Sequence, residues 1–510
     1  MIATAVFRSA ILEKFSFVMS EDQMTGHENN ADQRAMSAYG YKQELRRTIR
    51  LFGSFAVAFS FISITTGIFA NYELVLDRSG PAGIWTWPVV IIGQLLVALV
   101  FAELAAKIPL TGYSYQWVTR LAGQGWGWFT GWLSVCFLII VIPSVDHSIA
   151  SVVGHVWEIP DGSSELKWIV YSVIALQALI HVFGVRFADL INSAAVFTEV
   201  VGMLGLVCIF TVLIFRNQPS FEILFARASL QEGQSYLPVW IMASLMGAYT
   251  IVGFESAANL SEETINASRT VPKAVIGSVV ISGVVGLFFL VVTVLGIQDL
   301  DTVIKSDYPL PLIIENNLGK TVAQAFFLLV VISIFACGLI IMASGSRMVY
   351  AMARDNVFPG STMLCRVSSR TGAPIPAILF VASLGVLAEC FSESLEQLLA
   401  AAAVLPALVY LLTVVTYTMR RKSLATRPGQ FSLGRWGMGI SLLAIIWLLL
   451  IIAVLSIPRE FHKATVVSFT VCGLGVILYW GWIRRRMVTG KAGVRTMQIQ
   501  DFEGNSHSER

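Results

Sequence analysis

Three acidic side chains, Asp146, Glu199 and Glu255, lie within long apolar stretches of this sequence. A charge at the centre of a membrane helix costs about 2.5 to 3.5 kcal/mol on insertion scales, so carboxylates in such places are generally functional. Glu199 lies in the apolar run at residues 197–202, and we expect it to face the interior of a helix bundle. There it could carry a proton or balance a cationic ligand, and a hydrogen-bonded structural carboxyl is the alternative.

The other two carboxylates occupy different places along their stretches. Asp146, which is followed by His147, is predicted in the outer third of its stretch. It could reach a water-filled vestibule and attract cations, or it could lie on a solvated helix face. Glu255 directly follows a glycine-containing interruption, and we expect its side chain to hold irregular backbone and to relay protons.

Two glycine-containing interruptions give a second signal, one at residues 63–69 and one at residues 249–256. Backbone that unwinds inside a membrane finds no partner in lipid, so it persists only where it lines a cavity or contacts a ligand. Amides of Thr66 to Ile68 at the start of a half-helix would suit a carboxylate, whereas carbonyls of Ser63 and Ile64 and of the second interruption would suit a cation. Close helix packing through small residues is the alternative for either interruption alone. The predicted ligand-contacting residues are Ser63, Ile64, Thr65, Thr66, Gly67, Tyr249, Thr250, Val252, Gly253 and Phe254.

The elements that must position these residues are membrane helices. The chain has 510 residues, of which 56% are hydrophobic and 13% are charged, against about 25% charged in soluble domains. A hydrocarbon core about 30 Å thick needs about 20 apolar residues per helix. About twelve such stretches occur, at residues 52–75, 85–106, 126–153, 167–184, 190–215, 236–260, 273–297, 321–346, 375–391, 395–418, 437–457 and 464–483. We therefore predict an all-α integral membrane protein of twelve transmembrane helices, with helices 1 and 6 unwound.

The distribution of basic residues predicts the orientation of the chain. Lys and Arg gather in one set of connections, and Arg484-Arg485-Arg486 closes the last stretch on the same side. The positive-inside rule then places both termini in the cytoplasm. We expect a tail at residues 1–50, a transporter-sized membrane domain at 51–484 and a second tail at 485–510, in the plasma membrane. Residues 7–19 lack a continuous apolar core, so we expect no cleaved signal peptide.

Other chemistries find no support in the sequence. The net charge of +3 indicates no nucleic-acid partner. The six cysteines show no CxxC spacing, and His155 and His181 fall near the ends of stretches, where we expect them at the membrane interface. We predict no catalytic residue, metal site or cofactor. The run at residues 318–321 lacks the upstream glycine of a phosphate loop, and no HExxH or GxSxG motif occurs. We therefore do not expect this protein to be an enzyme.

Four stretches, in this order and spacing, resemble the amino acid, polyamine and organocation (APC) permease superfamily. They are residues 63–69, the ELxxxxPxxGxxY pattern within 102–115, residues 252–256 with 261–264 and 269–273, and residues 346–355. Residues 41–47, 80–81 and 85–87 resemble the amino acid and choline transporter branch, which includes GABA permeases. The resemblance implies two inverted five-helix repeats, at about 51–215 and 236–418, and two extra helices at about 437–484.

The resemblance also implies that the substrate lies between spans one and six, with Tyr249 and Phe254 as aromatic walls or gates. Two departures from the family pattern bear on the chemistry. Thr65 and Thr66 replace a usual glycine and serine. Proton-coupled relatives carry a lysine seven residues after an asparagine of helix five, whereas Asn192 is followed at that distance by Glu199. An acid in place of a cation favours cationic or amine substrates.

These observations predict a secondary active transporter that works by alternating access in the lipid bilayer. Its expected substrate is an amino acid, a GABA-like acid or a related amine such as choline or a polyamine, taken up with protons. An exchanger of two amines or amino acids is one alternative. A membrane nutrient sensor that binds its ligand without transport is another.

Overall fold

The computed structural model of the protein describes residues 36–37, 39–157, 159, 163–216, 220–228, 235–306, 308–391, 395–424, 429–458 and 461–494. Among these residues the regular structure is helical, and the strand-type pairing is an isolated bridge between Ile49 and Thr264. Ten helices within this part of the chain are long and apolar enough to cross a membrane. The protein is therefore an all-helical, multi-pass membrane protein. Most of the two predicted tails, residues 1–35 and 495–510, falls outside the described residues.

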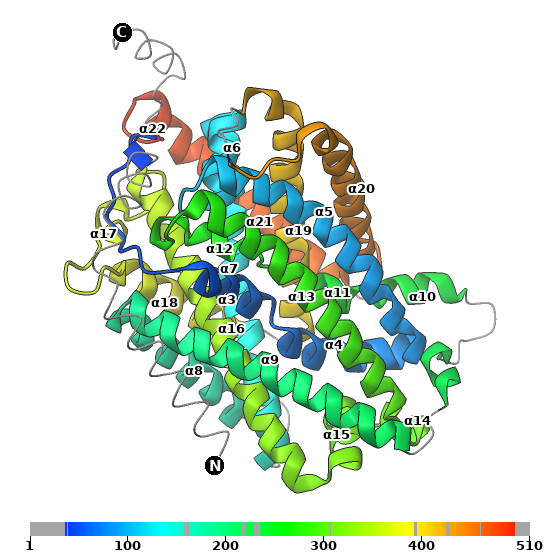
Figure 1. Cartoon of the computed structure of the whole chain (residues 1–510). Coiled ribbons are helices and arrows are strands. Elements are labelled where there is room, and N and C mark those ends of the chain that lie inside the picture. The colour runs from blue at the N-terminus through cyan, green and yellow to red at the C-terminus, as the bar shows by residue number, and fades with distance from the viewer. Residues whose placement is uncertain are drawn as a thin grey trace.

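The helices follow one another with short connections (Figure 1). The first seven are α3 (Leu51–Ile62), α4 (Ile64–Ser79), α5 (Thr86–Lys107), α6 (Tyr113–Ala122), α7 (Gln124–Trp157), α8 (Ser164–Phe183) and α9 (Val185–Arg216). The next six are α10 (Tyr236–Met242), α11 (Ser244–Thr250), α12 (Ser256–Asn259), α13 (Ala267–Leu295), α14 (Leu300–Ile304) and α15 (Pro309–Leu318). The last are α16 (Lys320–Arg354), α17 (Ser361–Leu364), α18 (Ile375–Phe391), α19 (Leu395–Arg420), α20 (Gly437–Ser456), α21 (His462–Leu478) and α22 (Arg484–Val488). Helices prevail because each satisfies its own backbone where lipid offers no hydrogen-bond partner.

Two of the twelve predicted spans are not among the ten long apolar helices. The stretch at 236–260 is divided into α10, α11 and α12, and the stretch at 375–391 forms α18, a helix of 17 residues. The ten others correspond to predicted stretches, with ends that differ by at most eight residues. The count of twelve spans and the inverted repeat remain predictions.

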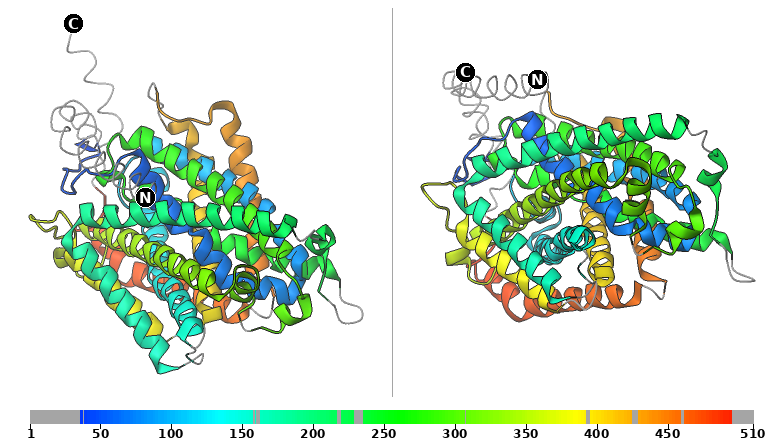
Figure 2. Two further views of the ribbon diagram at one scale, coloured as in Figure 1. Left: turned by 60° about the horizontal axis from the view of Figure 1, so that its bottom comes forward. Right: turned by 90° about the horizontal axis from the view of Figure 1, so that it is seen from below.

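The most buried span is α3 with α4, and the long helices α7, α16 and α19 are buried over about two thirds of their apolar part. α16 packs against α7 and α9, α13 packs against α5 and α3, and α19 packs against α7 and α20. The last two long helices, α20 and α21, lie along one edge in the orange to red part of the chain (Figure 2). Their outward side chains are large, exposed and apolar, among them Ile446 and Phe469, as expected of a surface that meets lipid.

Both ends of the described chain lie on one face of the bundle, which we call the terminal face. The hydroxyl of Tyr41 donates to Asp355 Oδ1 at 2.9 Å, and the amide of Gly493 donates to the carbonyl of Asp355 at 2.9 Å. Asp355 directly follows α16. The opposite face, where α7 ends and α16 begins, is called the far face below. Residues 39–50, predicted as part of a tail, instead pack into the terminal face, since Leu45 and Ile49 are each only 1% exposed.

Candidate functional site

The first helix break is a single residue, Ser63, between α3 and α4. Its φ of 36° lies in the left-handed region, which side chains rarely adopt. The hydroxyl of Ser63 accepts the amide of Thr66 at 3.3 Å, and its carbonyl accepts the amide of Gly67 at 3.1 Å. The half-helix therefore begins at Ile64, earlier than expected. In this structure the amides of Thr66 and Gly67 are used by Ser63 to cap the helix; that these amides and the Ser63 carbonyl contact a ligand stays a prediction.

The second break is longer and lies between α11 and α12, at residues 251–255. Gly253 has a φ of +85°, and a Cβ built on it would lie 1.7 Å from Cδ1 of Phe61 in α3. Its amide donates to the hydroxyl of Tyr410 at 3.1 Å, and this hydroxyl in turn donates to Glu255 Oε2 at 2.5 Å. Glu255 thus acts on the unwound backbone through Tyr410 of α19. Glycine is required here by both the backbone angle and the close approach of Phe61.

The two breaks touch each other. A Cβ built on Gly67 would lie 1.9 Å from Oγ1 of Thr250 and 2.5 Å from its Cβ. The start of α4 and the end of α11 therefore approach each other more closely than any side chain on Gly67 permits. The sequence predicted both interruptions, and the structure brings them together at this pair of residues.

This contact predicts a matched pair of variants. We expect Gly67→Ala to reduce substrate uptake strongly, because overpacking of this kind costs about 1 to 3 kcal/mol and pushes the two breaks apart. Adding Thr250→Gly removes the side chain that alanine would strike, so the double variant should recover part of the uptake. Initial uptake rates per correctly inserted protein are the measurement. Failure of Thr250→Gly to improve Gly67→Ala would mean that this contact does not govern transport.

A small cavity of about 20 Å³, lined by buried residues, lies between the breaks. Four of the predicted residues line it, namely Thr66, Gly67, Tyr249 and Val252, and further walls come from α3, α7, α16 and α19. Such a volume holds about one water molecule. A small organic ligand therefore requires the surrounding helices to separate before it can occupy this space.

The remaining predicted residues of the breaks lie elsewhere. Phe254 is fully buried, and its ring packs against the rings of Phe101 and Tyr410 at centroid distances of 5.8 and 5.3 Å. Phe254 therefore packs the second break against α5 and α19, and it does not line the cavity. The other predicted residues outside the lining are Ser63, Ile64, Thr65, Thr250 and Gly253. Tyr249 does line it, and its hydroxyl shares a hydrogen bond of 2.8 Å with Ser144 of α7.

Glu199 of α9 reaches the first break directly. Its Oε1 accepts hydrogen bonds from the hydroxyls of Thr65 at 3.1 Å and Ser63 at 3.4 Å. Ser333 of α16 joins the group through a 2.7 Å hydrogen bond with the Thr65 hydroxyl. The residue is 3% exposed, and its Oε2 has no hydrogen-bond partner within the described part of the chain. Adding or removing a proton on Glu199 would therefore alter hydrogen bonds that fix the start of α4.

Asp146 is more deeply buried than the sequence predicted. It is 0% exposed, and its Oδ1 accepts a hydrogen bond of 2.7 Å from Gln177 of α8. A Cβ on Gly338 would lie 2.6 Å from this oxygen, so the glycine lets the carboxylate approach α16. The expectation that Asp146 reaches a vestibule or a solvated face is wrong, because α8 and α16 cover it. The neighbouring His147 points elsewhere, with its Nδ1 3.5 Å from Glu389 Oε1.

The two histidines predicted at the interface differ. His155 is partly exposed near the far face, where its Nε2 lies 3.6 Å from Glu315 Oε1. His181 is 2% exposed and its Nε2 lies 2.7 Å from the carbonyl of Leu339 in α16, so its interfacial placement is wrong. Packing against α16 explains the burial. Among the described residues, no group of three or more His, Cys, Asp or Glu side chains could hold a metal ion.

A polar network closes the terminal face beneath the two breaks. Arg347 Nε and Glu263 Oε1 form a fully buried ion pair at 2.7 Å, and Arg354 pairs with Glu262 at 2.9 Å. Burial raises the pKa of Tyr41 to about 12, and the nearby Asp355 carboxylate adds to the rise. Tyr41 therefore keeps its proton at neutral pH and donates a hydrogen bond to Asp355.

Sequence reasoning missed the partners that reach the breaks from distant helices. Tyr410, Ser333 and Cys337 each stand in an apolar run without a motif of their own. Tyr410 binds the backbone of Gly253, and the thiol of Cys337 donates to the carbonyl of Phe61 at 3.2 Å. Each of them carries a polar atom within a membrane helix. Such an atom needs a hydrogen-bond partner, and this could have drawn attention to the three residues.

Paired broken helices that meet around a buried cavity, in a multi-pass helical bundle, define a membrane transporter. The comparison with known families agrees with this class. The chain belongs to the amino acid permease family, whose model matches residues 49–482, and is thus a permease of the APC superfamily. This confirms the resemblance found in the sequence.

Several curated proteins are similar over most of their length. The chain is 27% identical to the amino-acid permease BAT1 of Arabidopsis thaliana, over 90% of this chain and 96% of that protein. It is 29% identical to the BAT1 homolog of Oryza sativa subsp. japonica, over 83% of this chain and 87% of that protein. It is 24% identical to a putative polyamine transporter of Candida albicans, over 90% and 86% respectively. The family makes the protein a transporter of amino acids or amines.

Proposed function

We propose that this permease is an alternating-access secondary transporter that takes up an amino acid or a related amine together with protons. The observation that carries the proposal is the contact between Gly67 and Thr250, which joins the two breaks around one small cavity. Rocking one group of helices against the other would separate these residues. The cavity would then open to one face at a time. The ion pairs and hydrogen bonds of the terminal face would be intact while the cavity is closed on that side and broken when it opens there.

The lining of the cavity supports a small substrate with an apolar part. Val141, Val145 and Ile341 form an aliphatic wall, while the polar side chains of the lining are those of Thr66, Tyr249 and Cys337. Glu199 stands behind the first break and favours a substrate that carries an ammonium group. GABA-like acids, choline and polyamines fit this description beside ordinary amino acids, and similar proteins are named as amino-acid permeases and as a putative polyamine transporter.

Coupling to protons would act through Glu199. In the neutral form the carboxyl offers a proton of its own, whereas in the charged form it only accepts hydrogen bonds. A proton on Oε2, which has no partner among the described residues, would make Oε1 a weaker acceptor for the hydroxyls of Ser63 and Thr65, both of which donate to Oε1 in the structure. A proton on Glu199 would thereby favour one arrangement of the first break over the other. Glu255 and Asp146 are proposed to support gating, Glu255 through Tyr410 and Asp146 through its contact with α16.

The proposed location is the plasma membrane, with both termini in the cytoplasm. Both ends of the described chain share the terminal face. That face carries basic residues, among them Arg347 and Arg354 in the last two turns of α16 and Arg421 directly after α19. The positive-inside rule assigns such a face to the cytoplasm. The far face would then meet the outside of the cell.

Uptake into proteoliposomes tests the proposal. We expect purified protein to accumulate at least one radiolabelled compound from a panel of GABA, choline, putrescine, arginine, glutamate and alanine. An inwardly directed proton gradient should stimulate this uptake into vesicles without internal substrate. A requirement for internal substrate, with no response to the gradient, would establish the exchanger instead. Binding of a panel compound without flux would establish the sensor and overturn the transporter.

A further inference from the structure

A second cavity lies on the far face, where α7 ends and α16 begins. Its volume is about 360 Å³, compared with about 20 Å³ for the cavity between the breaks, and the two share no lining residue. Cavities that hold small molecules measure about 300 to 1,000 Å³. The far-face cavity can therefore accept a compact ligand in the structure as it stands, without any movement of the helices.

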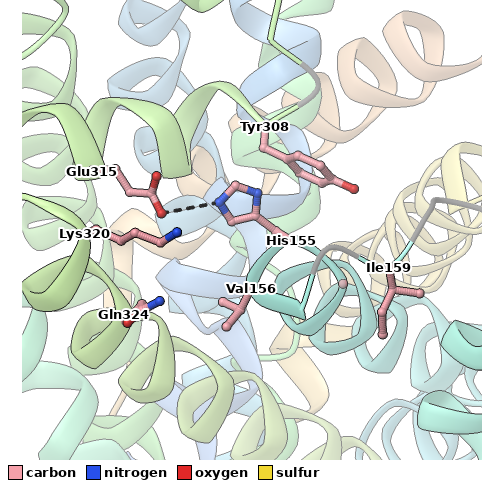
Figure 3. A pocket seen from close by; sticks show the side chains of 8 residues that line it. His155, Val156, Ile159, Tyr308, Glu315, Lys320 and Gln324 are labelled. Atoms are coloured by element: carbon pink, nitrogen blue, oxygen red, sulfur yellow. Dashed lines mark ion pairs between the residues drawn. The ribbon is translucent and has the colours of Figure 1, made fainter.

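Both signs of charge meet in this cavity (Figure 3). Glu315 extends from α15 toward His155 of α7, and Lys320 and Gln324 project from the first turns of α16 into the same space. The His155 and Glu315 side chains are 24% and 29% exposed, so this part of the cavity is largely shielded from solvent. The Tyr308 ring lies 5.0 Å from the His155 ring. Charged groups in a partly shielded cavity interact more strongly with a ligand than they do on an open surface.

We propose that the far-face cavity binds a zwitterion, namely an amino acid with one carboxylate and one ammonium group. The Lys320 ammonium is the donor for the carboxylate, and it stands at the N-terminal end of α16, which favours negative charge. Glu315 accepts hydrogen bonds from the ligand ammonium, and the Tyr308 ring offers it a second, weaker contact. Val156 and Ile159 cover the carbon chain. A ligand with a single charge would contact only one of the two charged groups, Lys320 or Glu315, and would bind more weakly.

The position of the cavity gives an occupant a means to influence transport. α15, which carries Glu315, packs against both α16 and α4. α4 is the half-helix that begins at the first break. A ligand that joins α15 to α16 would hold the far-side end of α4 in its present position. The site is additional to the central one and depends only on its own lining residues.

Protection of a cysteine from labelling tests the proposal on the full-length protein. The variant Gln324→Cys is made in a Cys208→Ser and Cys390→Ser background, because both of these native cysteines are exposed. In purified protein we measure its reaction with a polar maleimide while alanine, arginine or GABA is added. At about ten times the Kd, a bound zwitterion should slow labelling about tenfold. Thr321→Cys, exposed on the same helix turn but outside the lining, is the matched control and should show no protection.

Charge variants identify the contacts. Lys320→Gln and Glu315→Gln, each added to Gln324→Cys, should raise the concentration for half-protection about tenfold, as expected for loss of one charge-assisted hydrogen bond. Propionate and propylamine, which carry one charge each, should protect only weakly. Protection by either of them equal to that by the amino acids would overturn the zwitterion proposal. Absence of protection by all three amino acids would overturn the site itself.

A third experiment tests whether the far-face cavity and the central cavity are separate binding sites. Gly253→Val, and independently Gly67→Ala, disturb the central breaks while leaving the far-face lining intact. Protection of Gln324→Cys that persists in a folded variant of this kind supports a separate site, even if no transported substrate is found. Protection that disappears in both variants, with the protein still monodisperse, would mean that labelling reports the central site, and the proposal would fall.

Discussion

Gly253→Ala is expected to abolish substrate binding and uptake, although alanine adds only one carbon. The φ of +85° at Gly253 is unfavourable for any residue with a Cβ, and that Cβ would lie 1.7 Å from Cδ1 of Phe61. The left-handed angle alone costs about 1 to 2 kcal/mol, and the clash adds to it. Relief requires movement of Phe61 or of the 251–255 backbone. Either movement displaces the hydrogen bond from Gly253 to Tyr410 and reshapes the cavity.

The measurement is equilibrium binding and initial uptake by the purified variant. Gly205→Ala is a matched control, because Gly205 also lies in a long membrane helix, α9, and a Cβ there meets no atom within 4 Å. We expect this control to retain uptake and the thermal stability of the unmodified protein. A folded Gly253→Ala protein with normal affinity would show that the second break does not form the substrate site.

The positions of the breaks could be predicted because they leave a local signal. Gly67 and Gly253 interrupt apolar stretches at comparable places, and both prove to lie where another chain segment comes closer than a Cβ allows. The length of each break could not be predicted. At the first break the Ser63 hydroxyl and carbonyl restore the helix after one residue, and this depends on a backbone angle that the residue type alone does not determine.

The carboxylates show a second limit of sequence reasoning. Glu199 was expected to face the bundle interior, and it does, because a charge in a membrane helix must avoid lipid. Asp146 was expected near water, yet Gln177 and the approach of α16 at Gly338 bury it completely. Depth along a helix can be read from the sequence, whereas the identity of the neighbouring helix cannot. Tyr410 was missed for the same reason, because its partner Gly253 is 157 residues away in the sequence.

The second large effect is expected from Glu199→Gln. Glutamine keeps the size of the side chain and an oxygen that accepts hydrogen bonds from Ser63 and Thr65, but it does not bind and release a proton near neutral pH. If Glu199 carries the coupling proton, uptake by the unmodified protein rises as the external pH falls, since the proton-loaded form is favoured. Uptake by Glu199→Gln should then be independent of pH and of an imposed proton gradient. Exchange of labelled for unlabelled substrate, which needs no net proton movement, should survive.

Two further variants distinguish a proton carrier from a structural carboxyl. Ser333→Ala removes a hydroxyl that interacts with Thr65 and with the carboxyl but leaves Glu199 able to bind and release a proton, so uptake should fall and should still depend on pH. Glu255→Gln weakens the hold of Tyr410 on the second break and should likewise reduce the rate without flattening the profile. A Glu199→Gln protein whose uptake still follows pH would assign the carboxyl to structure. If Glu255→Gln flattened the profile instead, the proton would be carried at the second break.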